Sequence, residues 1–318
     1  MSFKLKNLDA KDLKILQILD QDVRASYSQI GRKAKISKET VQYRIKRLEE
    51  EKIITGYYAF LNVTSPGYKF LIKNKSLSEK NKEDFEKFVT GHTMVTWFAN
   101  TEGNYDYVIS IVPKEDIKLV SFVKEILDKF GSYFRERHLL KIFSAYSTNE
   151  KYLFNGKYLY TYEMNLLHPK INPDQTENKL IREISLNSRQ SFTDLGKKLN
   201  LTPEAISYRF KRVMKNKNII GLKLRLDYAK LGLNYYHLFI SLQDQSIRKK
   251  LINYYIMHPD CNALLEEIGL YDMHIEFMLP SERIEEVMDD LRLRFGDKIS
   301  NYELLNIRKE FKLNILVD

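Results

Sequence analysis

Apolar positions in the first 57 residues recur at helical spacing, in three short stripes. Spacings of three and four residues place each stripe on one face of a helix, so the pattern predicts three short amphipathic helices. Ser37 stands just before the third stripe and can cap that helix. The stripes are formed by Leu13, Leu16 and Leu19, by Ile30 and Ala34, and by Val41, Ile45 and Leu48.

The pattern of residues 67–149 is different, because strand-like runs alternate there with two helical ones. The order strand, helix, strand, strand, helix, strand predicts a four-stranded antiparallel sheet with two helices on one face. The other face of this sheet is still apolar and requires a partner. The expected strands are 68–75, 94–103, 105–113 and 134–146, and the expected helices are 82–89 and 117–131.

Both patterns occur twice along the chain. A shift of 165 residues places "TVQYRIKRLEEEKII" (40–54) on "AISYRFKRVMKNKNI" (205–219) and Arg24 on Arg189. The sequence therefore predicts a tandem duplication in which the sheets of the two halves pack together as an internal pseudo-dimer. The expected domains are 1–66, 67–149, 172–231 and 232–318, with residues 150–171 as a connector.

A tight turn separates the second and third helices in each half. The turn reads "KISKE" in the first half and "NLTPE" in the second, where Thr202 can cap the helix and Pro203 can start it. This order predicts a helix-turn-helix, and the alternation at 53–63 and 219–229 suits a two-stranded wing. The predicted fold class is α+β: two winged helix-turn-helix domains alternating with two ferredoxin-like βαββαβ domains.

The formal net charge of +10 is concentrated around the repeated helix. Residues 1–57 hold 13 Lys/Arg against 8 Asp/Glu, and residues 172–226 hold 12 against 5. The rest of the chain is slightly acidic. Two basic islands of this kind are typical of proteins that bind an anionic polymer, and with a helix-turn-helix in each island we expect double-stranded DNA as the partner.

The outward face of the third helix is the predicted reading surface. Because Val41, Ile45 and Leu48 point inward, helical geometry turns the polar side chains of the same helix outward or to its flanks. Arg44 and Arg209 are expected to clamp phosphates, and Gln42 to address base edges. The predicted DNA-binding residues are Lys38, Gln42, Tyr43, Arg44, Lys46 and Arg47 in the first half, and Ser207, Tyr208, Arg209, Lys211 and Arg212 in the second. Since Gln42 aligns with Ser207, and Lys38 with Pro203, unequal half-sites are expected.

The chain resembles a known family at these residues. "ISKETVQYRIKRLEEEKIITGY" (36–57), followed by "EGNYDYVISI" (102–111), is similar to the leucine-responsive and asparagine-regulator (Lrp/AsnC) family of prokaryotic transcription factors. The resemblance implies a winged helix-turn-helix joined to a βαββαβ domain of the RAM type, which mediates dimerisation and senses amino acids. A fused tandem chain departs from the usual single-copy architecture, so a higher homo-oligomer stays open.

The same resemblance places an amino-acid effector near the Gly-x-Tyr-Asp turn. Asp106 and Asp272 would be available there for an ammonium group. The alternative is ordinary turn chemistry, in which Gly supplies an unusual backbone angle and Asp accepts hydrogen bonds from backbone N–H groups. The residues concerned are Gly103, Tyr105 and Asp106, and Gly269, Tyr271 and Asp272.

Two histidines are the main argument for another class of protein. His237 and His274 are expected on neighbouring strands, with Asp272 and Glu276 on the face of His274, where such a cluster could bind metal or move protons. The first half has Leu71 and Val108 at the matching positions. Siroheme decarboxylases are similar to this family in fold, but a compact His-Asn-Tyr stretch is missing here. We expect structural histidines, no catalytic residue, no metal and no cofactor; an architectural DNA-binding protein is a third reading.

Further signals narrow the class of protein. No apolar run approaches the length of a membrane span, and the N-terminus lacks the apolar core of a signal peptide, so a cytoplasmic protein without a membrane partner is expected. The single Cys261 excludes an internal disulfide. The tyrosine-rich connector is expected to pack partly as an extra strand or hairpin, with residues 168–173 as a hinge.

Overall fold

The computed structural model describes residues 5–62, 66–75, 77–166 and 171–313. Each half begins with the predicted trio of helices, and the predicted caps form: the Ser37 hydroxyl accepts from the Thr40 amide at 3.1 Å, and the Thr202 hydroxyl from the Ala205 amide at 3.2 Å. The helices are α1 (Ala10–Gln21), α2 (Tyr27–Ala34) and α3 (Lys38–Glu50), then α6 (Gln175–Leu186), α7 (Phe192–Leu199) and α8 (Pro203–Lys215).

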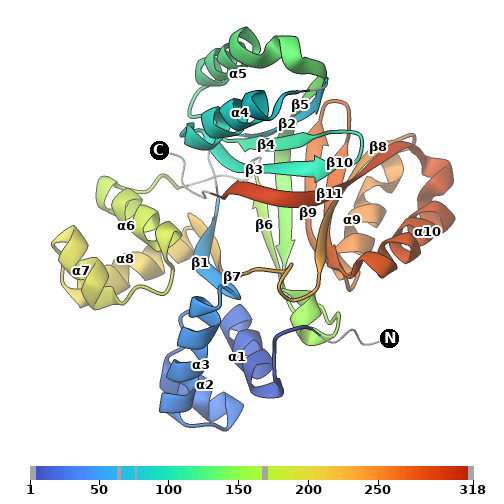
Figure 1. The fold of residues 1–318 in the computed structure, drawn as a ribbon. Helices are drawn as coiled ribbons and strands as arrows, with labels where there is room; N and C mark the ends of the chain where they lie inside the picture. The colour runs from blue at the N-terminus through green and yellow to red at the C-terminus, as the bar shows by residue number, and fades with distance from the viewer. Residues whose placement is uncertain (1–4, 63–65, 76, 167–170, 314–318) are drawn as a thin grey trace.

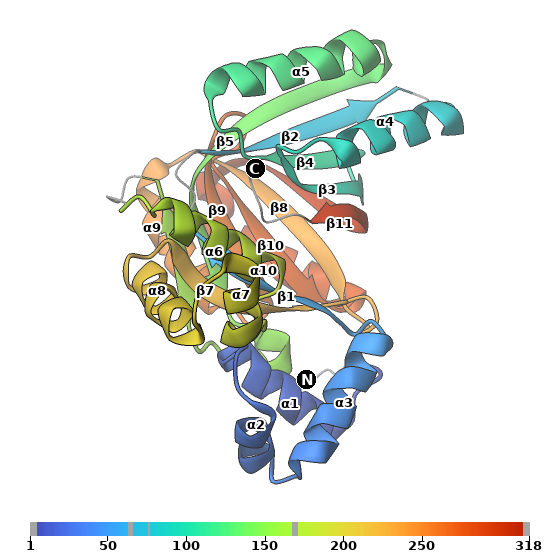
Figure 2. The same ribbon diagram turned by 90° about the vertical axis from the view of Figure 1, so that its left-hand side faces the viewer.

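One strand follows each trio, β1 (Ile54–Leu61) in the first half and β7 (Ile219–Leu226) in the second. These strands pair with each other, antiparallel, and form a sheet of their own. The two-stranded wing expected in each unit is thus one ribbon that the two halves build together, and each strand supplies the hydrogen-bonding edge that the other lacks. Figure 2 shows the ribbon running between the two helical trios.

The two βαββαβ units form as predicted, with sheet orders β5-β2-β4-β3 and β11-β8-β10-β9. Helices α4 and α5 cover the first sheet and α9 and α10 the second, on opposite sides of the strands (Figure 1). The first unit consists of β2 (Gly67–Asn74), α4 (Glu79–Gly91), β3 (Val95–Glu102), β4 (Tyr107–Ile111), α5 (Asp116–Phe130) and β5 (Phe134–Thr148). The second consists of β8 (Asn234–Leu242), α9 (Arg248–Met257), β9 (Cys261–Ile268), β10 (Met273–Leu279), α10 (Ile284–Phe295) and β11 (Ile299–Leu313).

The two sheets also join at both edges, because β11 pairs with β3 and β5 pairs with β9. Eight strands therefore close into a ring, which leaves none of their edges open for aggregation. The apolar inner faces meet in one core, as the sequence predicts for an internal pseudo-dimer. This core includes Leu71, Trp97, Val108, Leu140, Phe239 and Leu305.

The connector packs as expected. A short turn of helix (Lys151–Phe154) is followed by β6 (Thr161–Asn165), which pairs with the C-terminal part of β5. Of the hinge predicted at 168–173, residues 168–170 lie outside the described residues. Within the described ranges, no helix has the length and apolar character that crossing a bilayer requires.

Candidate nucleic-acid interface and central cavity

Helix α3 presents the outward face that its apolar spacing predicts. Val41, Ile45 and Leu48 are buried in the core of the first trio. Side chains on the opposite face are exposed, among them Tyr43, whose exposed fraction is 68%. The exposed set is Lys38, Glu39, Gln42, Tyr43 and Lys46.

Helix α8 repeats this face with other side chains. Tyr208 is the counterpart of Tyr43 and is 66% exposed, while Ser207 is half-buried. Pro203, Glu204 and Lys211 are exposed. The two tyrosines stand at equivalent positions of the two reading helices, so each half presents an aromatic ring on its outward face.

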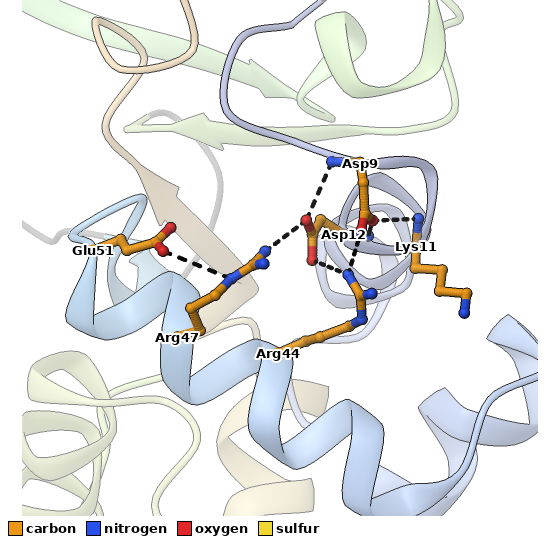
Figure 3. A network of polar contacts seen from close by, with 6 residues as sticks. All are labelled: Asp9, Lys11, Asp12, Arg44, Arg47 and Glu51. Atoms are coloured by element: carbon orange, nitrogen blue, oxygen red, sulfur yellow. Dashed lines mark hydrogen bonds and ion pairs between the residues drawn. The ribbon is translucent and has the colours of Figure 1, made fainter.

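The arginines of α3 are engaged within the protein (Figure 3). The Arg44 guanidinium donates to Asp9 Oδ2 at 2.7 Å and to Asp12 Oδ1 at 2.8 Å. Arg47 donates to Asp12 Oδ2 at 2.6 Å. Asp9 and Asp12 form the capping box of α1, so the two arginines join the reading helix to the N-terminus of α1. The Asp12 amide and the Arg44 guanidinium lower the pKa of Asp9 to about 2.

The second half carries the same network. Arg209 donates to Asp174 Oδ2 at 2.8 Å, and Arg212 Nε lies 2.9 Å from Glu177 Oε1. Asp174 and Glu177 form the capping box of α6. Arg44 and Arg209 therefore have a supporting contact that periodicity alone does not reveal, since it depends on how α1 and α6 pack beside the reading helices.

A reciprocal contact holds the two helix-turn-helix units together. Arg24 Nη1 and Nη2 donate to the carbonyls of Ser188 and Gln190 at 2.6 and 2.9 Å. Arg189 Nη1 donates to the carbonyls of Val23 and Ala25 at 2.5 and 3.2 Å. Burial and the nearby Arg189 charge lower the pKa of Arg24. The repeat aligns these two arginines, but only the fold brings them together.

Each Gly-x-Tyr-Asp turn lies against the last strand of the other half. Gly103 has φ +144°, and a Cβ there would lie 2.7 Å from Leu305 Cδ2. Gly269 has φ +149°, and its Cβ would lie 2.7 Å from Leu140 Cδ2. Both glycines thus serve the docking of the halves, through a backbone angle and a close approach that other residues do not tolerate.

The Tyr and Asp of these turns are engaged too. Tyr105 and Tyr271 are buried in the inner core. Asp106 accepts from the Asn74 amide at 2.6 Å. Asp272 accepts from the Leu242 amide at 2.7 Å and from Arg248 at 2.9 Å. Turn chemistry therefore accounts for these residues, and effector binding by them stays a prediction.

A cavity of about 340 Å³ lies where the β1–β7 ribbon meets the ring of strands. Its lining is largely aromatic and aliphatic, and its charged side chains are Lys69, Glu150, Arg225, Glu276 and Glu310. The volume falls at the lower end of the range for small-molecule sites. Sequence reasoning missed this cavity because its walls come from both halves and from the connector.

The two histidines do meet in space, beside this cavity. His274 Nδ1 lies 2.7 Å from Glu267 Oε1, and its Nε2 lies 3.1 Å from Glu276 Oε1. His237 Nε2 lies 3.7 Å from the same oxygen of Glu276. Burial lowers the pKa of His237 well below its usual value. For His274 burial acts the same way, but the Glu267 carboxylate outweighs it and raises the pKa.

A second buried polar cluster joins the first trio to the ribbon. The Glu150 amide donates to Asp20 Oδ1 at 3.3 Å, and Lys223 Nζ lies 3.1 Å from Glu150 Oε1. Tyr160 donates its hydroxyl to the Asp20 carbonyl at 2.8 Å. Burial and the Glu150 charge raise the pKa of Asp20 to about 7, against the lowering effect of Lys223.

Comparison with known proteins agrees with this architecture. Residues 8–49 match the AsnC-type helix-turn-helix domain, and residues 173–217 match a winged helix-turn-helix DNA-binding domain. The HTH-type transcriptional regulator Ptr1 of Methanocaldococcus jannaschii is 36% identical over 120 residues, which are 37% of this chain and 80% of the relative. The proline dehydrogenase transcriptional activator of Rhizobium radiobacter is 33% identical over 114 residues, 35% of this chain and 73% of the relative.

A solved structure shares the fold over nearly the whole chain. The siroheme decarboxylase NirDL has a TM-score of 0.63 and 15% identity, and the likeness covers 96% of this chain and 93% of that one. At this identity it shows the fold alone.

The fold and the two exposed reading helices define a DNA-binding protein of the helix-turn-helix class. The chain belongs to the Lrp/AsnC family and is a DNA-binding transcriptional regulator with two helix-turn-helix units.

Proposed function

We propose that α3 and α8 of one chain bind the two halves of a single DNA site. The observation that carries this proposal is the reciprocal contact of Arg24 and Arg189, which, with the β1–β7 ribbon, holds the two units as a pair. Helix-turn-helix pairs read half-sites about one helical turn apart, roughly 34 Å. A fused pair raises the effective concentration of the second contact without association of further chains.

The two half-sites differ in sequence. Gln42 and Lys38 are exposed on α3, whereas Ser207 and Pro203 stand at the equivalent positions of α8. A glutamine can bond an adenine edge with two hydrogen bonds, whereas a serine offers one hydroxyl to either base type. The two surfaces therefore favour different base pairs.

The phosphate contacts come from the exposed lysines. Lys38, Lys46 and Lys211 lie on the outward faces, while Arg44 and Arg209 are held by the aspartates of the capping boxes. We assign Arg44 and Arg209 to positioning the reading helices. Arg47 and Arg212 also pair with carboxylates, but Arg212 remains 43% exposed and can reach a phosphate as well.

Selection from random duplex DNA at two salt concentrations tests the proposal. The full-length protein should enrich a two-part motif with unequal halves, and the spacing of the halves should be fixed. Best binding to a symmetric palindrome would contradict the unequal half-sites. Salt-sensitive retention without any enrichment would favour an architectural role.

The charge of the cavity argues against a decarboxylase reaction on a porphyrin. NirDL has been solved with an iron-uroporphyrin III analogue, a ring that carries carboxylates around its edge. Here the lining offers Lys69 and Arg225 against three glutamates. Burying a polyanion against an acidic wall is unfavourable. Turnover of siroheme by the purified protein would overturn this part of the proposal.

A further inference from the structure

Three potential metal ligands converge on two neighbouring strands of the second half. His237 comes from β8, and His274 and Glu276 come from β10. One ligand atom of each lies within 4.8 Å of the others. Both histidine side chains are fully buried, and Glu276 reaches the wall of the cavity. An ion can therefore enter from the cavity side, through Glu276.

The groups around these ligands have the arrangement found behind bound metals. Glu267 holds the Nδ1 side of His274 at 2.7 Å and leaves Nε2 directed at Glu276. Tyr235 donates its hydroxyl to Glu276 Oε2 at 2.5 Å and leaves Oε1 directed at the histidines. Metal-bound histidines almost always donate their other ring N–H to a carboxylate or carbonyl, which fixes the ring.

His237 is the least explained member of the cluster. Among the residues that the structure describes, neither of its ring nitrogens has a hydrogen-bond partner, although the side chain is only 1% exposed. Its ring stacks on Trp97 and on His274, each at 5.2 Å between centroids. Buried polar atoms without hydrogen-bond partners are rare and cost stability. The unpartnered Nε2 of His237 therefore indicates that this atom binds a ligand.

The charges nearby also leave room for a cation. Lys69 Nζ lies 3.9 Å from Glu276 Oε1, and the negative charges of Glu276, Glu267 and Glu310 all act on it, although burial lowers its pKa. Three carboxylates stand against the ammonium of Lys69, and even a protonated His274 would leave a surplus of negative charge. A divalent ion would neutralise this surplus, and the flexible Lys69 side chain is the group that it would push aside.

We propose that His237, His274 and Glu276 bind one divalent transition-metal ion, zinc or a metal of similar ligand preference. Two imidazoles and a carboxylate are a donor set that zinc takes up, and three protein ligands leave a coordination position open. Of the three ligands, Glu276 lines the cavity. Since Trp97 and Lys69 belong to the first half, the ion would sit where the two halves meet.

The duplication supplies the matched control. In the first half, Val108 stands at the position of His274, and Lys69 stands at the position of His237, because Lys69 pairs with Ser110 as His237 pairs with Glu276. The sequence alignment, which placed Leu71 there, was wrong at this point: Leu71 is the counterpart of Phe239. The double variant His237→Leu/His274→Val removes both imidazoles and leaves apolar side chains of the kind that fill the inner core, where Val108 already stands at the position equivalent to His274. His92→Gln, at the end of α4, changes a histidine outside the cluster.

Titration of the metal-free full-length protein with Co²⁺, followed by visible absorption, and with Zn²⁺, followed by calorimetry, tests the proposal. We expect one ion per chain, unchanged in His92→Gln and lost in His237→Leu/His274→Val. Glu267→Gln should weaken binding about 10- to 100-fold. Lys69→Met should strengthen it.

Three outcomes would overturn the metal site: no binding to the wild type, equal binding to the double variant, or no effect of Glu267→Gln in a variant whose circular dichroism is native. DNA binding is measured separately on the same samples. The metal site does not depend on the regulator proposal, so either can fail alone.

Discussion

Arg24 and Arg189 occupy equivalent positions in the two halves, and each donates hydrogen bonds to the backbone carbonyls that flank the other. Each guanidinium also lies over an aromatic ring of the opposite unit, Arg24 at 4.4 Å from Phe192 and Arg189 at 5.3 Å from Tyr57. One local pseudo-twofold contact thus sets how the two reading helices are presented together.

Replacing Arg24 by Gln should uncouple the two units. Charge-assisted hydrogen bonds contribute about 1.5–3 kcal/mol, so we expect the free energy of unfolding to fall by about 2 kcal/mol. Affinity for a full DNA site should drop about tenfold, whereas affinity for an isolated half-site should hold. Arg189→Gln should behave alike, and exposed Arg135→Gln is the control. Equal losses on full and half sites would refute the coupling role.

The arginines and lysines of the reading helix should separate in experiment. Arg44→Gln breaks two ion pairs to Asp9 and Asp12 and should lower stability by about 1–3 kcal/mol. Lys46→Gln should leave stability unchanged and reduce the salt dependence of DNA binding by about one phosphate contact. Urea denaturation and binding at four salt concentrations measure both. If Arg44→Gln kept the stability of the wild type but reduced the salt dependence of DNA binding, Arg44 would be a phosphate contact after all.

Gln42 should govern sequence preference in one half-site only. In Gln42→Ala we expect relaxed selection at one or two base pairs, with a loss of about 1–3 kcal/mol in discrimination. Ser207→Ala should act in the other half-site. Sequencing of the selected DNA measures the base preference in both half-sites. If either variant changed the preference in both half-sites, the two helices would not read the site separately.

Asp20 should make stability depend on pH. Its folded-state pKa of about 7 lies above the usual 3.8, so folding takes up a proton between these values and stability falls as pH rises through that window. Relative to Asp20→Asn, the wild type should lose roughly 2 kcal/mol between pH 5 and pH 8. Thermal unfolding of both proteins at several pH values checks this. Asp22→Asn, which removes an exposed carboxylate nearby, is the control. A difference that is constant with pH would contradict the shift.

The glycines of the two turns should be required for docking of the halves. Gly103→Ala and Gly269→Ala each place a methyl group against the opposite final strand at an unfavourable φ, and should cost about 1–3 kcal/mol or more. Gly91→Ala, which meets nothing within 4 Å, should be nearly neutral. Chemical denaturation compares the three. If all three melted alike, the turn glycines would have no special role.

The sequence predicted the elements of the fold closely, because their signals are local. The stripe of Val41, Ile45 and Leu48 defines α3 and its buried side, and all three residues are in the core. The last strand of the first sheet is expected at 134–146, and β5 spans Phe134–Thr148. The inward packing of the two sheets followed from their unpaired apolar faces.

What the sequence could not predict depends on neighbours in space. The period of β1 shows which side chains face inward, but its hydrogen-bonding edge carries no side-chain signal. The wing was therefore expected within each unit, whereas β1 pairs with β7 of the other half. Helical periodicity predicts that Arg44 lies on the flank of α3, but it does not show what that flank contacts. Only the packing of α1 decides whether that flank meets solvent or a pair of aspartates.

The sequence by itself thus determined the duplication, the order of elements and the outward face of each reading helix, because periodicity and alignment are properties of the chain. The tertiary structure alone decided the closed ring, the Arg24–Arg189 contact and the convergence of His237, His274 and Glu276. These features join residues far apart in the chain, and their distances exist only after the two halves have packed.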